Sequence, residues 1–378
     1  MSNPLLDISS VEKEVEASTE RIKHSKQKAL ELSINEGAAA SLSASLGDSY
    51  ITPFALLLKA NAFQIGLLSS LSGLISPISQ LLGSKLMESR SRKKIVLYFV
   101  LLEALMWLPI AALSYFAWRG IFPLTLPYTL VLLFTLLTAF SGIAFPAWFS
   151  WMGDLVPVKE KGKYYGKRNL VAGAVGLAGV LISAFVLDAF KTNGLALLGF
   201  SILFFLAFFF RVISYAIFKK QYSPKFKLKK DYYFSFWAFI KRFDNFGKFS
   251  VYRFFFYLSM YIASPFFAVY MLQDLNFSYV TFIIVSMSAS AFYLVFSPLI
   301  GKFSDRFGNI KLFYIGNLAF ALTPFLWLFI KSPLWLIAIP QLISGIGNAA
   351  LIISFTNFTY DAVSPQKRGI CAAYSNLL

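Results

Sequence analysis

The chain has 378 residues, of which 57% are hydrophobic and only 14% are charged. A soluble domain carries about 25% charged residues, and a soluble core of this size would have to hide 42 phenylalanines. The net charge of +17 does not point to nucleic acid, because the basic residues flank apolar runs and form no single patch. Lipid is therefore the expected solvent of this chain.

Residues 1–33 form a polar tail, and ten apolar runs follow it. Each run is long enough to cross a membrane as a helix of about 20 residues, so we expect an all-α polytopic membrane protein. The first run is the least apolar, because it is rich in alanine, serine and glycine and contains Asp48. The runs are 34–58, 62–83, 95–117, 124–150, 169–190, 195–218, 249–272, 278–300, 312–330 and 334–357.

The basic residues predict which helix ends face the cytoplasm. With the N-terminus placed inside, 29 of the 35 lysines and arginines fall on cytoplasmic segments and four on the other side, as the positive-inside rule requires. The basic, aromatic stretch 219–248 either lies against an anionic leaflet or is a solvated loop whose charges only fix topology. We therefore expect a tail (1–33), a six-helix bundle (34–218), a linker (219–248) and a second bundle (249–378), in the plasma membrane.

The sequence offers little for metal or nucleophilic chemistry. The single cysteine, Cys371, cannot form an intramolecular disulfide, and the single histidine, His24, lies in the polar tail. No G-x-x-x-x-G-K-[ST] motif occurs, so the sequence indicates no P-loop ATPase site. We expect no enzyme activity, no cofactor and no bound metal.

Two polar stretches between the runs match at an offset of 217 residues. Residues 301–311 read G-K-x-x-D-R-x-G-x-x-K, and residues 84–94 are a weaker echo in which Glu88 stands at the position of Asp305 and serines replace both glycines. This pattern resembles the loop signature of the major facilitator superfamily of secondary transporters. The motif residues are Ser84, Glu88, Arg92, Gly301, Asp305, Arg306 and Gly308.

A second pair of segments, 154–169 and 361–376, matches at an offset of 207 residues. Each follows the fourth run of its half, and the runs themselves share a Ser-Gly-Ile triplet at 141–143 and 344–346. Two halves with matching loops are what the parallel repeats of a facilitator predict. The residues of interest here are Asp154, Gly162, Arg168, Asp361, Arg368 and Gly369.

The resemblance also assigns partners to the motif acids. It implies that Asp305 docks on the start of the fifth span, near Arg168 and Asn169, and that Glu88 docks on the start of an eleventh span. The alternative is that 301–311 is only a solvated turn that fixes topology. Asn376, the counterpart of Asn169, is followed by only two residues, so we expect the last two helices of the fold to be missing from this chain.

Charged residues inside the runs are expensive and often functional. Asp48 lies midway along its run and Glu103 roughly 12 Å into the third span, at about 1.5 Å per residue. Both are candidates for a substrate or proton cavity, and the alternative for Asp48 is a paired carboxylate within the bundle. Arg211 and Arg253 lie nearer the cytoplasmic ends, where snorkelling is the alternative. Asn348 is a further cavity candidate, or part of a glycine packing face.

Two features have a structural interpretation only. Asp188 lies near the outer end of its run and is expected to be a surface cap. Gly173, Gly176 and Gly179 follow no predicted strand, so they are no dinucleotide fingerprint, and we expect them to line a closely packed helix face.

The resemblance implies a secondary transporter, a symporter or antiporter, that moves a small solute by alternating access. If transport is coupled to protons, Asp48 or Glu103 would exchange the proton. The alternatives are a non-transporting receptor or scaffold on this fold, or a truncated inactive remnant. We expect a monomer in a bilayer with an anionic cytoplasmic leaflet and no nucleic-acid partner. The solute is not readable, because one scaffold serves many solutes.

Overall fold

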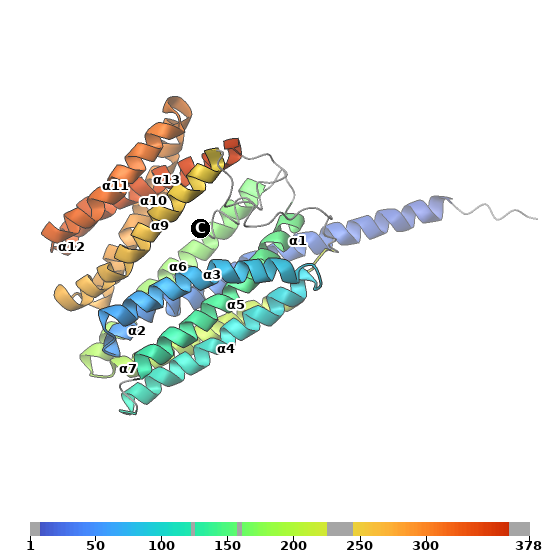
Figure 1. The fold of residues 1–378 in the computed structure, drawn as a ribbon. Helices are drawn as coiled ribbons and strands as arrows, with labels where there is room; N and C mark the ends of the chain where they lie inside the picture. Colours follow the sequence, from blue (N-terminus) through green and yellow to red (C-terminus); the bar gives the residue numbers. More distant parts are fainter. Residues whose placement is uncertain (1–7, 122–124, 157–160, 225–244, 363–378) are drawn as a thin grey trace, which may run out of the picture.

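The computed structural model describes residues 8–121, 125–156, 161–224 and 245–362, and every regular element in these ranges is a helix (Figure 1). Nine of the helices described there are long and apolar enough to cross a membrane, which confirms the all-α polytopic fold. The elements are α1 (Ile8–Leu46), the short η1 (Asp48–Tyr50), α2 (Ile51–Leu57), α3 (Ala62–Leu86), α4 (Arg92–Trp118), α5 (Leu126–Leu155), α6 (Lys161–Thr192), α7 (Ala196–Lys220), α9 (Asn245–Val269), the π turn η3 (Tyr270–Asp274), α10 (Tyr279–Phe307), α11 (Asn309–Phe329), α12 (Pro333–Leu336), the π turn η4 (Ile337–Gln341) and α13 (Leu342–Ala362).

The predicted run 34–58 does not form one unbroken span. Helix α1 ends at Leu46, a single tight turn follows, and α2 continues to Leu57. The break lies where the buried Gly47 packs against Trp107 of α4, so closely that a Cβ atom on Gly47 would lie 2.3 Å from the indole ring. This run is also the only one of the ten that is not among the membrane-length apolar helices of the described ranges.

Local sequence signals explain where several helices begin and end. Asn61 and Gln64 form a reciprocal capping box at the start of α3, with both hydrogen bonds at 2.9 Å.

The predicted turn at 301–311 is wrong for most of its length, because α10 continues to Phe307. Only Gly308 turns the chain, at φ 85°, a conformation that glycine adopts without a Cβ clash.

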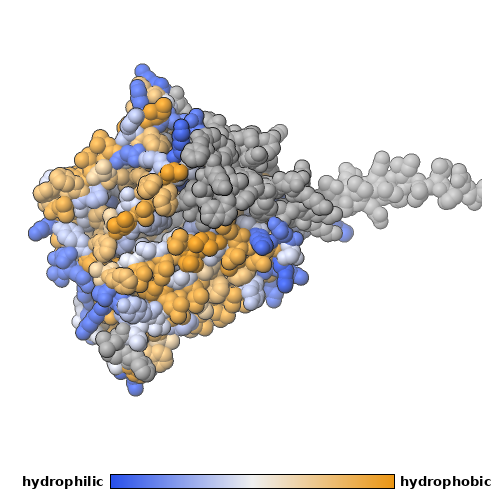
Figure 2. All heavy atoms as spheres, in the orientation of Figure 1, coloured by the Kyte–Doolittle hydropathy of each residue, from blue (hydrophilic) through white to orange (hydrophobic). Residues whose placement is uncertain are grey.

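The helices pack in two groups, α1 to α7 and α9 to α13 (Figure 1). We call the distal end the one that holds the connections 58–61, 119–121, 193–195 and 275–278, and the proximal end the one that holds 87–91, 221–224 and 308. The largest buried cluster lies at the distal end and joins both groups, for example through Phe200 and Tyr279. Apolar side chains also spread over the outer surface (Figure 2), as expected for helices that face lipid.

The two predicted repeats form equivalent contacts at the proximal end. Arg92, at the start of α4, donates to the carbonyl oxygen of Ser150 on α5 at 2.9 Å. Asn309, at the start of α11, accepts from the Nδ2 of Asn357 on α13 at 2.9 Å. Arg92 and Asn309 differ by the predicted offset of 217, and Ser150 and Asn357 by the predicted offset of 207. The interhelical hydrogen bond that an arginine forms in the first half is thus formed by two side-chain amides in the second.

The shared Ser-Gly-Ile triplets also occupy equivalent contacts. A Cβ atom on Gly142 would lie 2.5 Å from the carbonyl oxygen of Ser76 on α3, and one on Gly345 would lie 2.7 Å from that of Ala289 on α10. Of the three glycines predicted to line one face of α6, Gly176 and Gly179 pack against α1. The prediction is wrong for the third, Gly173, which is exposed with open space around it.

An arginine–carboxylate network as candidate functional site

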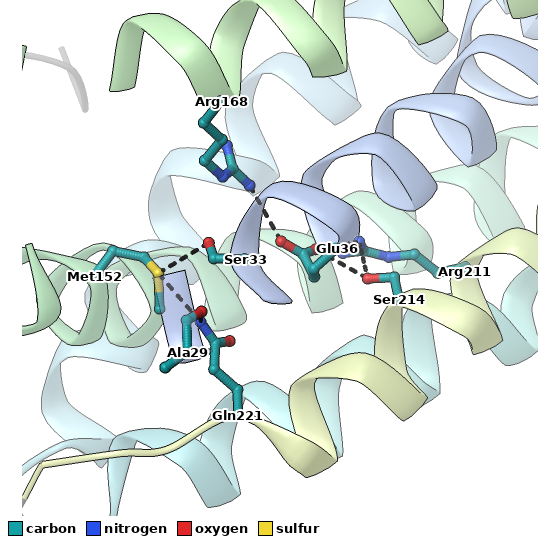
Figure 3. A network of polar contacts seen from close by, with 8 residues as sticks. All are labelled: Ala29, Ser33, Glu36, Met152, Arg168, Arg211, Ser214 and Gln221. Carbon is teal, nitrogen blue, oxygen red and sulfur yellow. Dashed lines mark hydrogen bonds and ion pairs between the residues drawn. The ribbon is translucent and has the colours of Figure 1, made fainter. Parts of the chain in front are cut away.

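Glu36 of α1 lies at the centre of a network inside the first helix group (Figure 3). Its side chain is only 3% exposed. One carboxylate oxygen accepts from the guanidinium of Arg168 on α6 at 3.1 Å, and the other accepts from the Oγ of Ser214 on α7 at 3.0 Å. Arg211 of α7 lies 4.0 Å from that second oxygen. The network therefore joins three helices through one carboxylate.

Arg211 extends the network to a fourth helix. Its guanidinium pairs with the carboxylate of Glu103 on α4 at 2.6 Å and donates to the Oγ of Ser214 at 3.3 Å. The side chains of Arg211 and Glu103 are 12% and 11% exposed, so the pair is largely shielded from solvent. Arg211 therefore does not snorkel to a membrane surface, which was the alternative for this residue, but turns into the bundle.

Asp48 stands at the helix break, beside this network. Its electrostatic interactions are with Glu103 and Arg211, and its neighbour Gly47 packs against Trp107, one helical turn from Glu103 on α4. Unlike the buried Gly47 and Tyr50 on either side, Asp48 is exposed. Within the described part of the chain its carboxylate has neither a hydrogen-bond nor an ion-pair partner, so the alternative of a paired carboxylate does not hold here.

The charges of this centre do not balance. Glu36, Glu103 and Asp48 supply three carboxylates, whereas Arg168 and Arg211 supply two guanidinium groups. With all five groups ionised the centre therefore attracts one more positive charge. In the described ranges no group of three or more metal-ligating side chains could hold a metal ion.

The remaining cavity candidates lie in the second helix group, apart from this centre. Arg253 of α9 stands over the rings of Phe249, Tyr257 and Phe355, with its guanidinium carbon 5.3 to 5.9 Å from their centroids. Asn348 of α13 is half-buried, and its neighbour Gly347 packs against Ala319 of α11. The glycine packing face, offered as the alternative for this stretch, is thus present.

Some motif residues of the first half form ion pairs, and others lie at the surface. Arg92 is buried and pairs with Asp154 at 2.7 Å, while Glu88 is exposed and Ser84 half-buried. Arg168 pairs with Glu36 and stacks on Trp148, with 4.9 Å from its guanidinium carbon to the ring centroid. The side chain of Asp305, its predicted neighbour, is not among the described residues.

The motif residues of the second half are described only in part. Arg306 is exposed, and Gly301 lies within α10, with nothing within 4 Å of where its Cβ atom would be. The side chains of Asp305 and Asp361 and the surroundings of Gly162 lie outside the described residues, as do Arg368 and Gly369.

Sequence reasoning missed two members of the network, Glu36 and Ser214. Glu36 begins the first run, where it looks like the end of the polar tail, and a serine inside an apolar run is unremarkable. The available signal was the pairing of charges: Arg168 and Arg211 both lie on helices that pack against α1, and Glu36 is the acid of that helix nearest to Asp48 in the sequence.

The arrangement of two helix groups with matching halves is that of a polytopic membrane transporter. The sequence profile of the Major Facilitator Superfamily matches residues 37–240 and 249–377, so the chain belongs to this family. A segment of 83 residues, 22% of the chain, is 34% identical to the vacuolar basic amino acid transporter 2 of Saccharomyces cerevisiae and spans 17% of that protein.

Solved structures of transporters share this fold. A mutant of the nucleoside transporter NupG is similar with a TM-score of 0.68 at 16% identity, over 92% of this chain and 87% of that one. A bacterial homologue of the iron transporter ferroportin in its inward-facing state gives 0.65 at 13% identity, over 93% and 88%. The outward-facing state of such a homologue gives 0.55 at 14% identity, over 92% and 88%.

Proposed function

We propose that this chain is a secondary transporter that moves a small solute by alternating access, and that its first bundle holds the binding centre. The observation that carries the proposal is the unpaired carboxylate of Asp48, at a helix break beside a buried network of two arginines and two glutamates. Charged side chains at this depth are rare in membrane helices and mark solute or ion pathways.

The charge surplus supports a cation as the species that the centre takes up. A proton on Asp48 or Glu103 would cancel the surplus, and so would the ammonium or guanidinium group of a solute. The yeast relative is named for basic amino acids, which carry such a group. We infer that transport is coupled to protons and that the solute carries a positive charge, with Asp48 as the group both compete for.

The basic connections support an orientation with the proximal end and the N-terminus in the cytoplasm. We propose a plasma-membrane protein with two bundles, 34–218 and 249–378, joined by the linker 219–248. We further propose that the motif acid Asp305 contributes to the proximal gate, with the start of α6 as its partner.

Asp48→Asn tests the proposal in proteoliposomes that contain the full chain. Uptake is measured for a panel of cationic, neutral and anionic solutes, with lysine and arginine among the cationic ones. We expect Asp48→Asn to abolish the accumulation of a cationic solute that an inward proton gradient drives, because the amide neither ionises nor pairs with a cation. If Asp48 serves the proton alone, solute exchange without a gradient persists. If it also binds the solute, exchange is lost as well.

Asp274→Asn is the matched control, because Asp274 is an exposed aspartate at the end of η3. It should leave uptake unchanged. Gradient-driven accumulation by the Asp48→Asn protein at the parent rate would contradict the assigned role, and uptake of neutral or anionic solutes alone would contradict the cationic one.

A further inference from the structure

Asp188 of α6 reaches across from the first helix group to the second at the distal end. One carboxylate oxygen accepts from the backbone N–H of Tyr279 at 2.9 Å, and the other accepts from the backbone N–H of Val280 at 3.1 Å. These are the first two residues of α10. The expected surface cap is therefore a cap on a different helix, in the other group.

The first turn of α10 is completed from two sources. Its own cap residue, Ser278, accepts from the N–H of Thr281 at 3.1 Å, and Asp188 takes the two preceding amides. A helix start presents unpaired N–H groups and a partial positive charge, and a carboxylate placed there is stabilised on both counts. Ser278 travels with α10 in any rigid movement of the second group, whereas Asp188 does not.

Tyr279 adds a second set of contacts across the same junction. It is 5% exposed, its ring stands edge-on to that of Phe200 on α7 at 5.8 Å between centroids, and the ammonium of Lys191 lies 5.1 Å from its centroid. One turn before Asp188 on α6, Ala184 is fully buried in the apolar cluster that joins both groups. Polar and apolar contacts thus join the two helix groups at the same point of the distal end.

We propose that Asp188 is a gating residue that holds the distal gate closed, by binding the start of α10 only while the two bundles meet at that end. This rests on the alternating access of the proposed function. Opening that end exchanges the two charge-assisted hydrogen bonds for water.

The test measures how often the junction opens, through the reactivity of a buried thiol. In the full chain with Cys371→Ser and Ala184→Cys, a maleimide reaches the new thiol only when the distal end opens, since Ala184 is fully buried. Adding Asp188→Asn should raise the labelling rate roughly ten-fold, because the amide presents one acceptor and no charge to two N–H groups. Asp188→Ala should raise it at least as much.

Two controls separate a gate from a general loosening. Ser278→Ala removes the cap that belongs to α10 itself and should leave the rate within about two-fold of the parent. A thiol introduced by Ala147→Cys, fully buried at the proximal end, should label equally slowly with and without Asp188→Asn. Equal rates at position 184 in parent and variants, or a parallel rise at position 147, would overturn the proposal. Labelling needs no solute, so this result is independent of the uptake assay.

Discussion

Replacing Arg211 with methionine is expected to destabilise the folded chain by about 3–5 kcal/mol, the cost of leaving the partner of a buried ion pair alone. Arg211 lies 2.6 Å from Glu103 and 4.0 Å from Glu36. Glu36 keeps Arg168 and Ser214, but Glu103 loses its ion-pair partner within an apolar bundle and remains beside Asp48. Thermal unfolding of the detergent-solubilised chain, before and after the change, measures the effect.

The same experiment contains its own rescue. Adding Glu103→Gln to Arg211→Met removes the stranded charge and should restore most of the lost stability, so the two changes together cost less than Arg211→Met alone. Arg119→Met is the matched control, because Arg119 is an exposed arginine at the end of α4, and it should change stability by no more than about 0.5 kcal/mol. An Arg211→Met chain that unfolds at the parent temperature would show that the pairing of Arg211 with Glu103 contributes nothing to the stability of the fold.

Most of the fold could be predicted from the sequence, because lipid imposes a length and a polarity on each helix. Nine of the ten predicted runs correspond to helices of membrane length in the described ranges. The exception contains Gly47 and Asp48, where the helix breaks and the apolar pattern is interrupted. Residues 301–307 of the predicted turn at 301–311 are helical, because their charged side chains tolerate a helix that continues beyond the apolar run.

The internal repeats were predictable to a finer degree than their weak identity suggests. The hydrogen bond between Arg92 and Ser150 and the one between Asn309 and Asn357 share no residue type. Their residues nevertheless differ in number by 217 and 207, the two offsets found from the flanking motifs. Backbone packing preserves the position of such an interhelical hydrogen bond, while different polar groups can form it. Identity between the halves therefore understates their structural equivalence.

The candidate site was predictable in its members more than in its pairings. Asp48, Glu103 and Arg211 were found because charges inside apolar runs are costly. No local pattern, however, says which helices face one another, so the ion pair of Arg168 with Glu36 of α1 could not be predicted. Asp188 illustrates the same limit: its position indicated a cap, but the helix that it caps begins 91 residues later.

The tight contact between α3 and α5 leads to the second large expected effect. Gly83 is buried where α3 crosses α5, and a Cβ atom there would lie 2.2 Å from the carbonyl oxygen of Ile143. That atom belongs to a helix backbone and cannot rotate away, so Gly83→Ala must push the two helices apart. Overpacking of this kind costs about 1–3 kcal/mol or more, which exceeds the gain of about 1 kcal/mol that alanine brings to a helix.

Gly66 offers the same substitution in the same helix without the contact, since nothing lies within 4 Å of its Cβ position. Gly66→Ala should therefore raise the unfolding temperature slightly, and Gly83→Ala should lower it. Opposite signs for one chemical change isolate the crossing with α5 as the cause, because helix propensity acts equally at both sites. If both variants shift in the same direction, the close approach of these helices is not what glycine is needed for at position 83.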